Sequence, residues 1–170
     1  MDYKIRTLKT EEVPLLEEFL YEAIFIPAGM EKPPREIVKQ PELEVYIRDF
    51  GCKKDDHALV AEAKNKIIGA VWVRIMDDYG HINDETPSLA ISVLNEYRGN
   101  GVGTALMEKM LDHLSMSGYT CVSLSVHKAN YAAKMYHNLG FKVISENAED
   151  CIMVHKLDHK KCSEKRDTEA

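Results

Sequence analysis

The fold of this chain depends most on the stretch Val93-Leu94-Asn95-Glu96-Tyr97-Arg98-Gly99-Asn100-Gly101-Val102-Gly103-Thr104-Ala105-Leu106. It joins an apolar, β-branched run, residues 88–93, to a segment from Val102 to His113 whose apolar residues recur at helical spacing. The glycines let the backbone take positive φ and let a ligand approach the amide groups closely. A helix that begins in this way directs unpaired N–H groups and its positive dipole end toward one point. The stretch therefore predicts an anion site of the kind that binds phosphate.

The spacing of the glycines excludes two common phosphate-binding motifs. A P-loop requires Gly-Lys-Ser/Thr, whereas Gly103 is followed directly by Thr104. A dinucleotide fingerprint, G-x-G-x-x-G, would place Thr104 or Leu106 at its last glycine. The pattern that fits is R-x-x-G-x-G, formed by Arg98, Gly101 and Gly103. The alternative is a tight strand-to-helix turn that binds no ligand.

A second pattern follows the first in the chain. Residues 120–127 alternate between apolar and polar side chains, which predicts a strand. Asn130 and a short helix from Tyr131 to Leu139 come next, with Gly140 as a left-handed cap. With these two motifs in this order, residues 3–157 resemble the GCN5-related N-acetyltransferase family.

This resemblance, together with the order of the elements, predicts the fold class. We expect an α/β (α+β) domain with a mixed, mostly antiparallel central sheet of about seven strands flanked by about four helices. The expected strands are 3–8, 57–62, 67–76, 88–93, 120–127, 142–144 and 151–155, and the expected helices are 11–23, 42–50, 102–113 and 131–139. Residues 1–157 would form a single acetyltransferase domain, and the polar residues 158–170 a disordered tail.

The resemblance also implies a cosubstrate, acetyl-CoA, and no metal. The residues implied to bind it are Ile91, Ser92, Val93, Arg98, Gly99, Asn100, Gly101, Val102, Gly103, Thr104, Asn130 and Tyr136. In the family, the glycine turn wraps the pyrophosphate, and the backbone of the strand before it pairs with pantetheine and supplies an oxyanion donor. Asn130 matches the position that hydrogen-bonds the pantetheine arm, and it also suits the cap of the next helix.

The reaction implied is acetylation of an amine by direct attack on the thioester in a ternary complex. Tyr136 matches the family tyrosine whose hydroxyl meets the cofactor sulfur; the alternative is a tyrosine that only fills core. Many family members carry a glutamate on the strand that corresponds to residues 88–93, but this chain has no carboxylate there. Glu85 in the preceding loop is the candidate general base, with Asp84 and His81 beside it, acting through water. An acidic loop that is only solvated is the alternative.

The remaining expectations concern the acceptor and rival functions. Tyr21, Phe25 and Met30 are candidate walls of an acceptor pocket, or plain core and loop packing. One rival function is a non-catalytic acyl-CoA-binding or regulatory module. The other is a thiol-nucleophile transferase that uses Cys121 or Cys151, although a buried structural thiol fits better in a strand.

Composition restricts the partners and the location. The net charge of −6 argues against nucleic-acid binding and favours a cationic acceptor, either a small molecule or a peptide amine. The four cysteines show no C-x-x-C spacing, and no run reaches the roughly 18 apolar residues of a membrane helix. We therefore expect a cytoplasmic protein without membrane partners, and a homodimer stays open.

Overall fold

The structure, a computed structural model, describes residues 1–158, so the predicted tail lies outside the described residues except for Asp158. Seven strands are present: β1 (Lys4–Thr7), β2 (His57–Ala63), β3 (Lys66–Arg74), β4 (Ser88–Val93), β5 (Cys121–His127), β6 (Lys142–Glu146) and β7 (Asp150–Lys156). The helices are α1 (Leu16–Ala23), α2 (Pro41–Glu44), α3 (Val102–Met116) and α4 (Ala132–Asn138). Within the described residues, no helix combines the length and apolar character that crossing a membrane requires.

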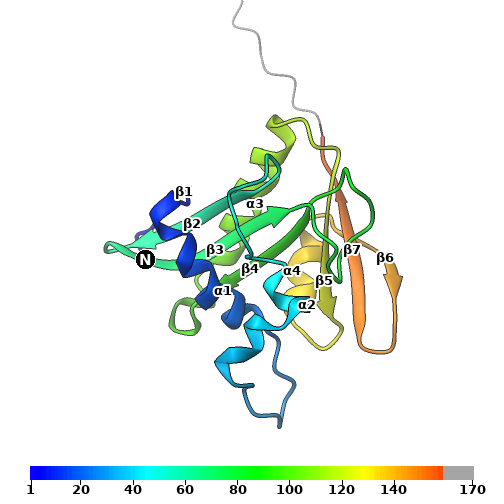
Figure 1. Ribbon diagram of the computed structural model, residues 1–170, viewed down its shortest axis with the longest axis horizontal. Coiled ribbons are helices and arrows are strands. Elements are labelled where there is room, and N and C mark those ends of the chain that lie inside the picture. The colour runs from blue at the N-terminus through cyan, green and yellow to red at the C-terminus, as the bar shows by residue number, and fades with distance from the viewer. Residues whose placement is uncertain (159–170) are drawn as a thin grey trace, which may run out of the picture.

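The strands form one sheet in the order β1-β2-β3-β4-β5-β7-β6 (Figure 1). All neighbouring strands run antiparallel except β4 and β5, which are parallel. A parallel pair needs a crossover connection, and α3 provides it on the way from β4 to β5. The predicted mixed, mostly antiparallel sheet is confirmed.

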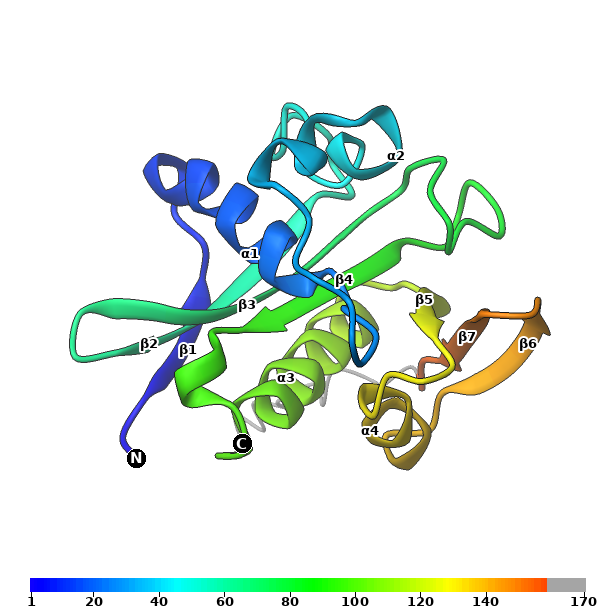
Figure 2. The same cartoon turned by 90° about the horizontal axis from the view of Figure 1, so that it is seen from below.

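Helices cover both faces of the sheet, with α1 and α2 on one side and α3 and α4 on the other (Figure 2). Successive side chains of a strand point to opposite faces. On β4, Leu89 and Val93 accordingly pack in the cluster that contains the buried face of α3, whereas Ala90 packs in the cluster of α1. Trp72 on β3 is fully buried in this second cluster, as its size favours.

The first helix begins differently from the prediction. Residues Thr10–Leu15 form a 3-10 helix, and the α-helix starts only at Leu16. Lys9 takes the cap position, and the Glu12 carboxylate accepts a hydrogen bond from the Lys9 N–H at 2.8 Å. Glu12 also pairs with Arg6 at 2.7 Å, which fixes the start of the helix to β1.

The predicted helix over residues 42–50 is wrong beyond its first turn. It ends as α2 at Glu44 and continues as turns to residue 50. The Arg74 guanidinium donates to the carbonyl oxygens of Val45 (3.1 Å) and Arg48 (2.7 Å), and the Trp72 indole donates to that of Tyr46 (3.1 Å). These carbonyls would serve a regular helix, so buried side chains of β3 replace part of its hydrogen bonding.

Candidate active site

Strands β4 and β5 touch at one end and then separate. Ser88 and Ser123 form the single residue pair that joins them within residues 1–158, and the Ser123 N–H donates to the Pro87 carbonyl at 3.0 Å. By contrast, β3 and β4 stay in register from Ser88 to Val93. We call the separated parts, residues 89–93 of β4 and 124–127 of β5, the β4–β5 fork. Its β4 edge leaves backbone groups without a strand partner, so an extended ligand could pair with them.

The side chains of β4 in the fork are used inside the protein. The Ser92 hydroxyl donates to the Phe19 carbonyl of α1 at 2.6 Å, and Val93 is buried toward α3. Ile91 packs partly buried on the same side as Val93. Any contribution of residues 91–93 to a cosubstrate must therefore come mainly from their backbone.

The start of α3 has the geometry of an anion site. Gly99 and Gly101 both have φ of 78°, and the first helical hydrogen bond runs from the Ala105 N–H to the Gly101 carbonyl at 3.0 Å. The amides of residues 102–104 therefore precede the hydrogen-bond ladder of the helix. Among the described residues, no side chain caps this end. These amides and the helix dipole together favour a phosphate. We call residues 98–104 the glycine cradle.

Gly103 shows that the glycine cradle has room for a ligand. A Cβ at this position would lie 3.7 Å from the Met135 sulfur of α4 and 3.8 Å from a methyl group of Val93. Those are ordinary contact distances, so the protein itself could accept a side chain here. Glycine instead leaves free the space where α3, α4 and β4 meet. The residues present thus fit a phosphate-bearing cosubstrate.

The side chains of Arg98 and Asn100 brace the glycine cradle. The Arg98 Nε donates to the Val93 carbonyl at 2.8 Å, and its Nη2 lies 3.3 Å from the Glu22 carbonyl and 3.7 Å from the Glu22 carboxylate. The Asn100 amide donates to the carbonyls of Tyr97 and Arg98. The Arg98 cation, implied by sequence to wrap a phosphate, thus ties the turn to the ends of β4 and α1.

Two predicted residues come from the β5–α4 region. The Asn130 Oδ1 accepts from the Ala132 N–H at 3.0 Å, a turn bond just before α4, whose N-cap is Tyr131. This bond uses the side-chain oxygen and leaves the amide N–H₂ for another partner. Tyr136 is 8% exposed and packs near Phe141, with 5.9 Å between the ring centres. Burial raises the pKa of Tyr136 to about 12, with a smaller contribution from Tyr131. The phenol therefore stays protonated at neutral pH and has a proton to donate in a hydrogen bond.

The acidic loop between β3 and β4 separates its carboxylates into two groups. Glu85 is exposed in a turn, where its N–H donates to the Asn83 side chain at 2.9 Å. His81 lies 3.6 Å from the exposed Asp84 carboxylate. Asp78, in contrast, is half-buried and accepts a hydrogen bond from the Ser88 hydroxyl at 2.8 Å. Sequence reasoning missed Asp78, because no spacing shows that the loop folds back onto the first residue of β4.

The three expected pocket-wall residues have different surroundings. The Tyr21 hydroxyl donates to the Pro33 carbonyl at 2.6 Å and thereby closes the loop that follows α1. Phe25 stacks on His127 at the end of β5, with 4.8 Å between ring centres, so this loop reaches across the fork. Met30 is 66% exposed. Phe25 therefore contacts the fork through His127.

The thiol-nucleophile alternative gains no support from the cysteines. Cys121 and Cys151 are half-buried free thiols on β5 and β7. Within residues 1–158, the hydrogen-bond partner of the Cys151 sulfur is the Glu146 carboxylate at 3.9 Å, not the histidine that such a mechanism needs.

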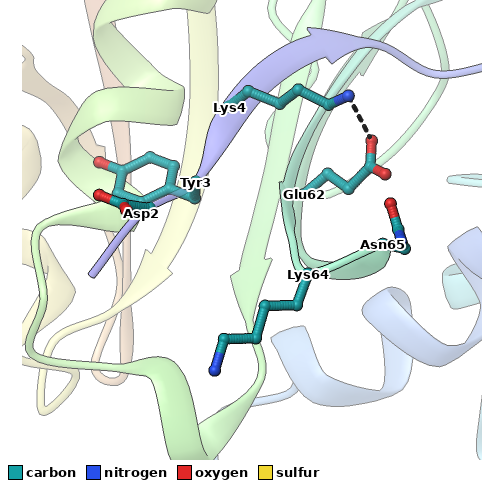
Figure 3. Close-up of a pocket in the computed structure, with 6 residues that line it drawn as sticks. All are labelled: Asp2, Tyr3, Lys4, Glu62, Lys64 and Asn65. Atoms are coloured by element: carbon teal, nitrogen blue, oxygen red, sulfur yellow. Dashed lines mark ion pairs between the residues drawn. The ribbon is translucent and has the colours of Figure 1, made fainter.

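A solvent-open hollow of about 280 Å³ lies elsewhere, at the β1 edge of the sheet (Figure 3). Its lining consists of Asp2, Tyr3, Lys4, Glu62, Lys64 and Asn65. Lys4 and Glu62 form an ion pair across it at 3.6 Å. It shares no residue with the β4–β5 fork or the glycine cradle, and its charged lining is that of an ordinary surface.

Comparison with solved structures supports the same fold. PaiA N-acetyltransferase from Thermoplasma acidophilum, in complex with coenzyme A, has a TM-score of 0.67 at 23% identity, covering 92% of this chain and 99% of that one. YncA from Salmonella typhimurium, a putative acetyltransferase with its cofactor acetyl-CoA, has a TM-score of 0.66 at 17% identity, covering 93% and 95%. The ribosomal-protein-S18-alanine N-acetyltransferase from Escherichia coli has a TM-score of 0.65 at 17% identity, covering 92% and 95%.

Curated relatives match part of the chain. Human N-acetyltransferase 8B is 33% identical over 84 residues, which is 49% of this chain and 37% of that protein. N-acetylaspartate synthetase from Xenopus tropicalis is 34% identical over 85 residues, 49% of this chain and 30% of that protein. The chain thus spans well under half the length of these relatives. The sequence pattern of the acetyltransferase (GNAT) family matches residues 22–141, from the end of α1 to the residue before β6. That segment contains the fork, the glycine cradle and Tyr136, so the chain belongs to the acetyltransferase (GNAT) family.

Proposed function

We propose that this chain transfers the acetyl group of acetyl-CoA to a primary amine, and that the amine attacks directly in a ternary complex. The observation that carries the proposal is the position of the glycine cradle. Its N–H groups lie at the uncapped start of α3, beside the end of β4. There the backbone of residues 91–93 is no longer paired with β5. One ligand that joins a pyrophosphate to an extended amide-bearing arm would use both features.

The chain's own groups suggest how such a ligand is held. The amides of residues 102–104 would bind the pyrophosphate, and the backbone of residues 91–93 would pair with the pantetheine amides. The Asn130 amide N–H₂, which the turn bond to the Ala132 N–H does not use, would be a further donor toward that arm. Bound acetyl-CoA would supply the thioester that the amine attacks. The net charge of −6 does not oppose this, since exposed charges beyond about 10 Å are screened while the amides make direct contact.

Two donors are proposed for the charges that develop during transfer. A backbone N–H of residues 91–93 would face the carbonyl oxygen of the thioester, because these groups lack a β5 partner. The Tyr136 hydroxyl would hydrogen-bond the sulfur that becomes a thiolate. Its protonated state at neutral pH suits that task.

The acceptor is proposed only as a primary amine. Relatives and structural neighbours carry names that point to different acceptors, among them N-acetylaspartate synthetase, mycothiol acetyltransferase and a ribosomal-protein-S18-alanine N-acetyltransferase. The α1 and α2 face of the fork, where Phe25 meets His127, is the proposed entry side.

Calorimetric titration with acetyl-CoA tests the cosubstrate, with ATP and dephospho-CoA as controls. We expect micromolar binding of acetyl-CoA and none of ATP. A library of primary amines, including aspartate and a peptide that begins with alanine, is then tested for thiol release. Binding without turnover of any amine would favour the non-catalytic acyl-CoA-binding module, and absence of binding would refute the proposal.

A further inference from the structure

Asp78 is a carboxylate that the fold holds at the root of the β4–β5 fork. The Ser88 hydroxyl donates to its Oδ1 at 2.8 Å, and Ser88 is the one residue of β4 that pairs with β5. The Tyr46 side chain forms a hydrogen bond with the same carboxylate. Burial, together with the negative charge of Asp78, raises the pKa of Tyr46 far above its ordinary value, so the phenol remains a donor.

The partners of Asp78 are themselves fixed by buried groups. The Trp72 indole donates to the Tyr46 carbonyl at 3.1 Å, and Trp72 is fully buried. Arg74, which is 3% exposed, forms two 3.1 Å hydrogen bonds with the Asp56 carboxylate and also binds the backbone on both sides of Tyr46. A carboxylate held by preorganised donors keeps one geometry, as proton-transfer sites require.

The loop that carries Asp78 is pressed against β5. The Ser123 hydroxyl donates to the Gly80 carbonyl at 2.7 Å. A Cβ at Gly80 would lie 3.2 Å from the backbone of both Leu124 and Ser125, a tight contact that glycine avoids. The contact holds the loop over the closed end of the fork. Ser88 also lies on the strand face that Ser92 shares, and Ser92 bonds to α1. Asp78 therefore stands on the α1 and α2 side, where the acceptor is proposed to enter.

We infer that Asp78 is the general base that accepts the proton of the acceptor ammonium. This inference rests on the proposed function. It assigns to a loop residue the task for which β4 itself has no carboxylate. Along a strand, Ser88 and Ile91 are separated by roughly 10 Å, so the proton reaches Asp78 through ordered water. Glu85, the earlier candidate, is exposed, and its described contact is made by its backbone.

The acceptor R–NH₃⁺ gives one proton, through water, to the Asp78 carboxylate. The nitrogen lone pair then forms the C–N bond, the C–S bond breaks, and its electron pair stays on sulfur. A second proton leaves the nitrogen and goes to the sulfur, which yields the amide and the thiol of CoA. Asp78 finally returns its proton to solvent, so the net products are an acetylated amine, CoA thiol and H⁺.

The test compares Asp78→Asn with Asp77→Asn, because Asp77 is the neighbouring exposed acid of the same loop. The probes are acetyl-CoA and the fastest amine of the library. For Asp78→Asn we expect kcat/KM at pH 7 to fall by about 100-fold or more, with unchanged affinity for acetyl-CoA and an unchanged thermal midpoint. Asp77→Asn should behave like the wild type.

The pH profile separates a base from a structural residue. Without a base, the rate of Asp78→Asn should follow the free-amine fraction and rise about tenfold per pH unit up to the amine pKa near 10. The wild-type profile should level off earlier. The inference would be overturned if Asp78→Asn were as active as the wild type, or if it lost activity but kept the wild-type pH profile. In either case the proposed function would still stand, provided that the wild type binds acetyl-CoA and acetylates an amine. If the wild type acetylates no amine, both the proposed function and the role of Asp78 are refuted.

Discussion

At the scale of single residues, the buried environment of Tyr136 restricts the catalytic role proposed for it. An ordinary thiol has a pKa of about 8.5, whereas burial raises the pKa of Tyr136 to about 12. Handing over the phenolic proton to a thiolate would therefore cost about 5 kcal/mol. A hydrogen bond to the sulfur requires no such transfer. Tyr136 is thus better suited to stabilise the leaving thiolate as a donor than to protonate it.

This assignment predicts the behaviour of Tyr136→Phe. We expect kcat to fall by about tenfold, because one hydrogen bond to a developing charge is lost, and the affinity for acetyl-CoA to stay constant. The ratio of wild-type to variant rates should not change between about pH 6 and about pH 9, since the phenol does not titrate there. Tyr131→Phe is the control, because Tyr131 adjoins the same helix and is 77% exposed. A rate ratio that varies with pH, or unchanged kcat, would contradict the assignment.

At the scale of elements, glycines near the two ends of α3 allow the proposed ligand binding to be tested separately from stability. Gly103 has no positive φ, and a Cβ there meets only ordinary contact distances. Gly118, just beyond the other end, has φ of 89° with open space around it. We expect Gly103→Ala to weaken acetyl-CoA binding by about tenfold or more while the thermal midpoint is kept or rises, because alanine favours helix. Gly118→Ala should instead lower the free energy of unfolding by roughly 1 kcal/mol and leave the affinity for acetyl-CoA unchanged. Calorimetry and thermal melts measure both, and unchanged affinity in Gly103→Ala would refute the glycine cradle.

The elements also show how far the sequence can predict this molecule. The strands and α3 follow from local alternation and helical spacing, which are properties of the segments themselves. Residues 42–50 have helical spacing too, yet Arg74 and Trp72 bind their carbonyls, and this depends on packing against β3. For the same reason Asp78 could not be predicted from the sequence, because its hydrogen bond with Ser88 depends on how the loop folds. Gly103 could be predicted as part of the site, since its motif is contiguous.

At the scale of the whole molecule, a chain of polar side chains closes the end of the domain that lies away from the start of α3. The Tyr119 hydroxyl donates to the Asp55 carboxylate at 2.5 Å and lies 3.3 Å from the His57 Nε2. The His57 Nδ1 lies 3.1 Å from the His113 Nε2. Because the Tyr119 proton is directed at Asp55, His57 donates from Nε2 and accepts at Nδ1 from His113. This arrangement joins β2, α3 and two loops.

Protonation of His57 breaks that arrangement, which makes the stability of the whole domain depend on pH. Burial first, and His113 second, lower the pKa of His57 below its ordinary value. The unfolded chain therefore binds more protons than the folded chain as pH falls through about 6.5, so the free energy of unfolding decreases there and is greatest above about pH 7. A second window lies below about pH 4.5, because Arg6 lowers the pKa of Glu12 to about 2. Thermal melts of the wild type and His57→Gln should differ in slope between about pH 7 and about pH 5, with equal acetyl-CoA affinity, since the glycine cradle lies at the far end of α3. Parallel slopes would show that His57 does not control this acid sensitivity.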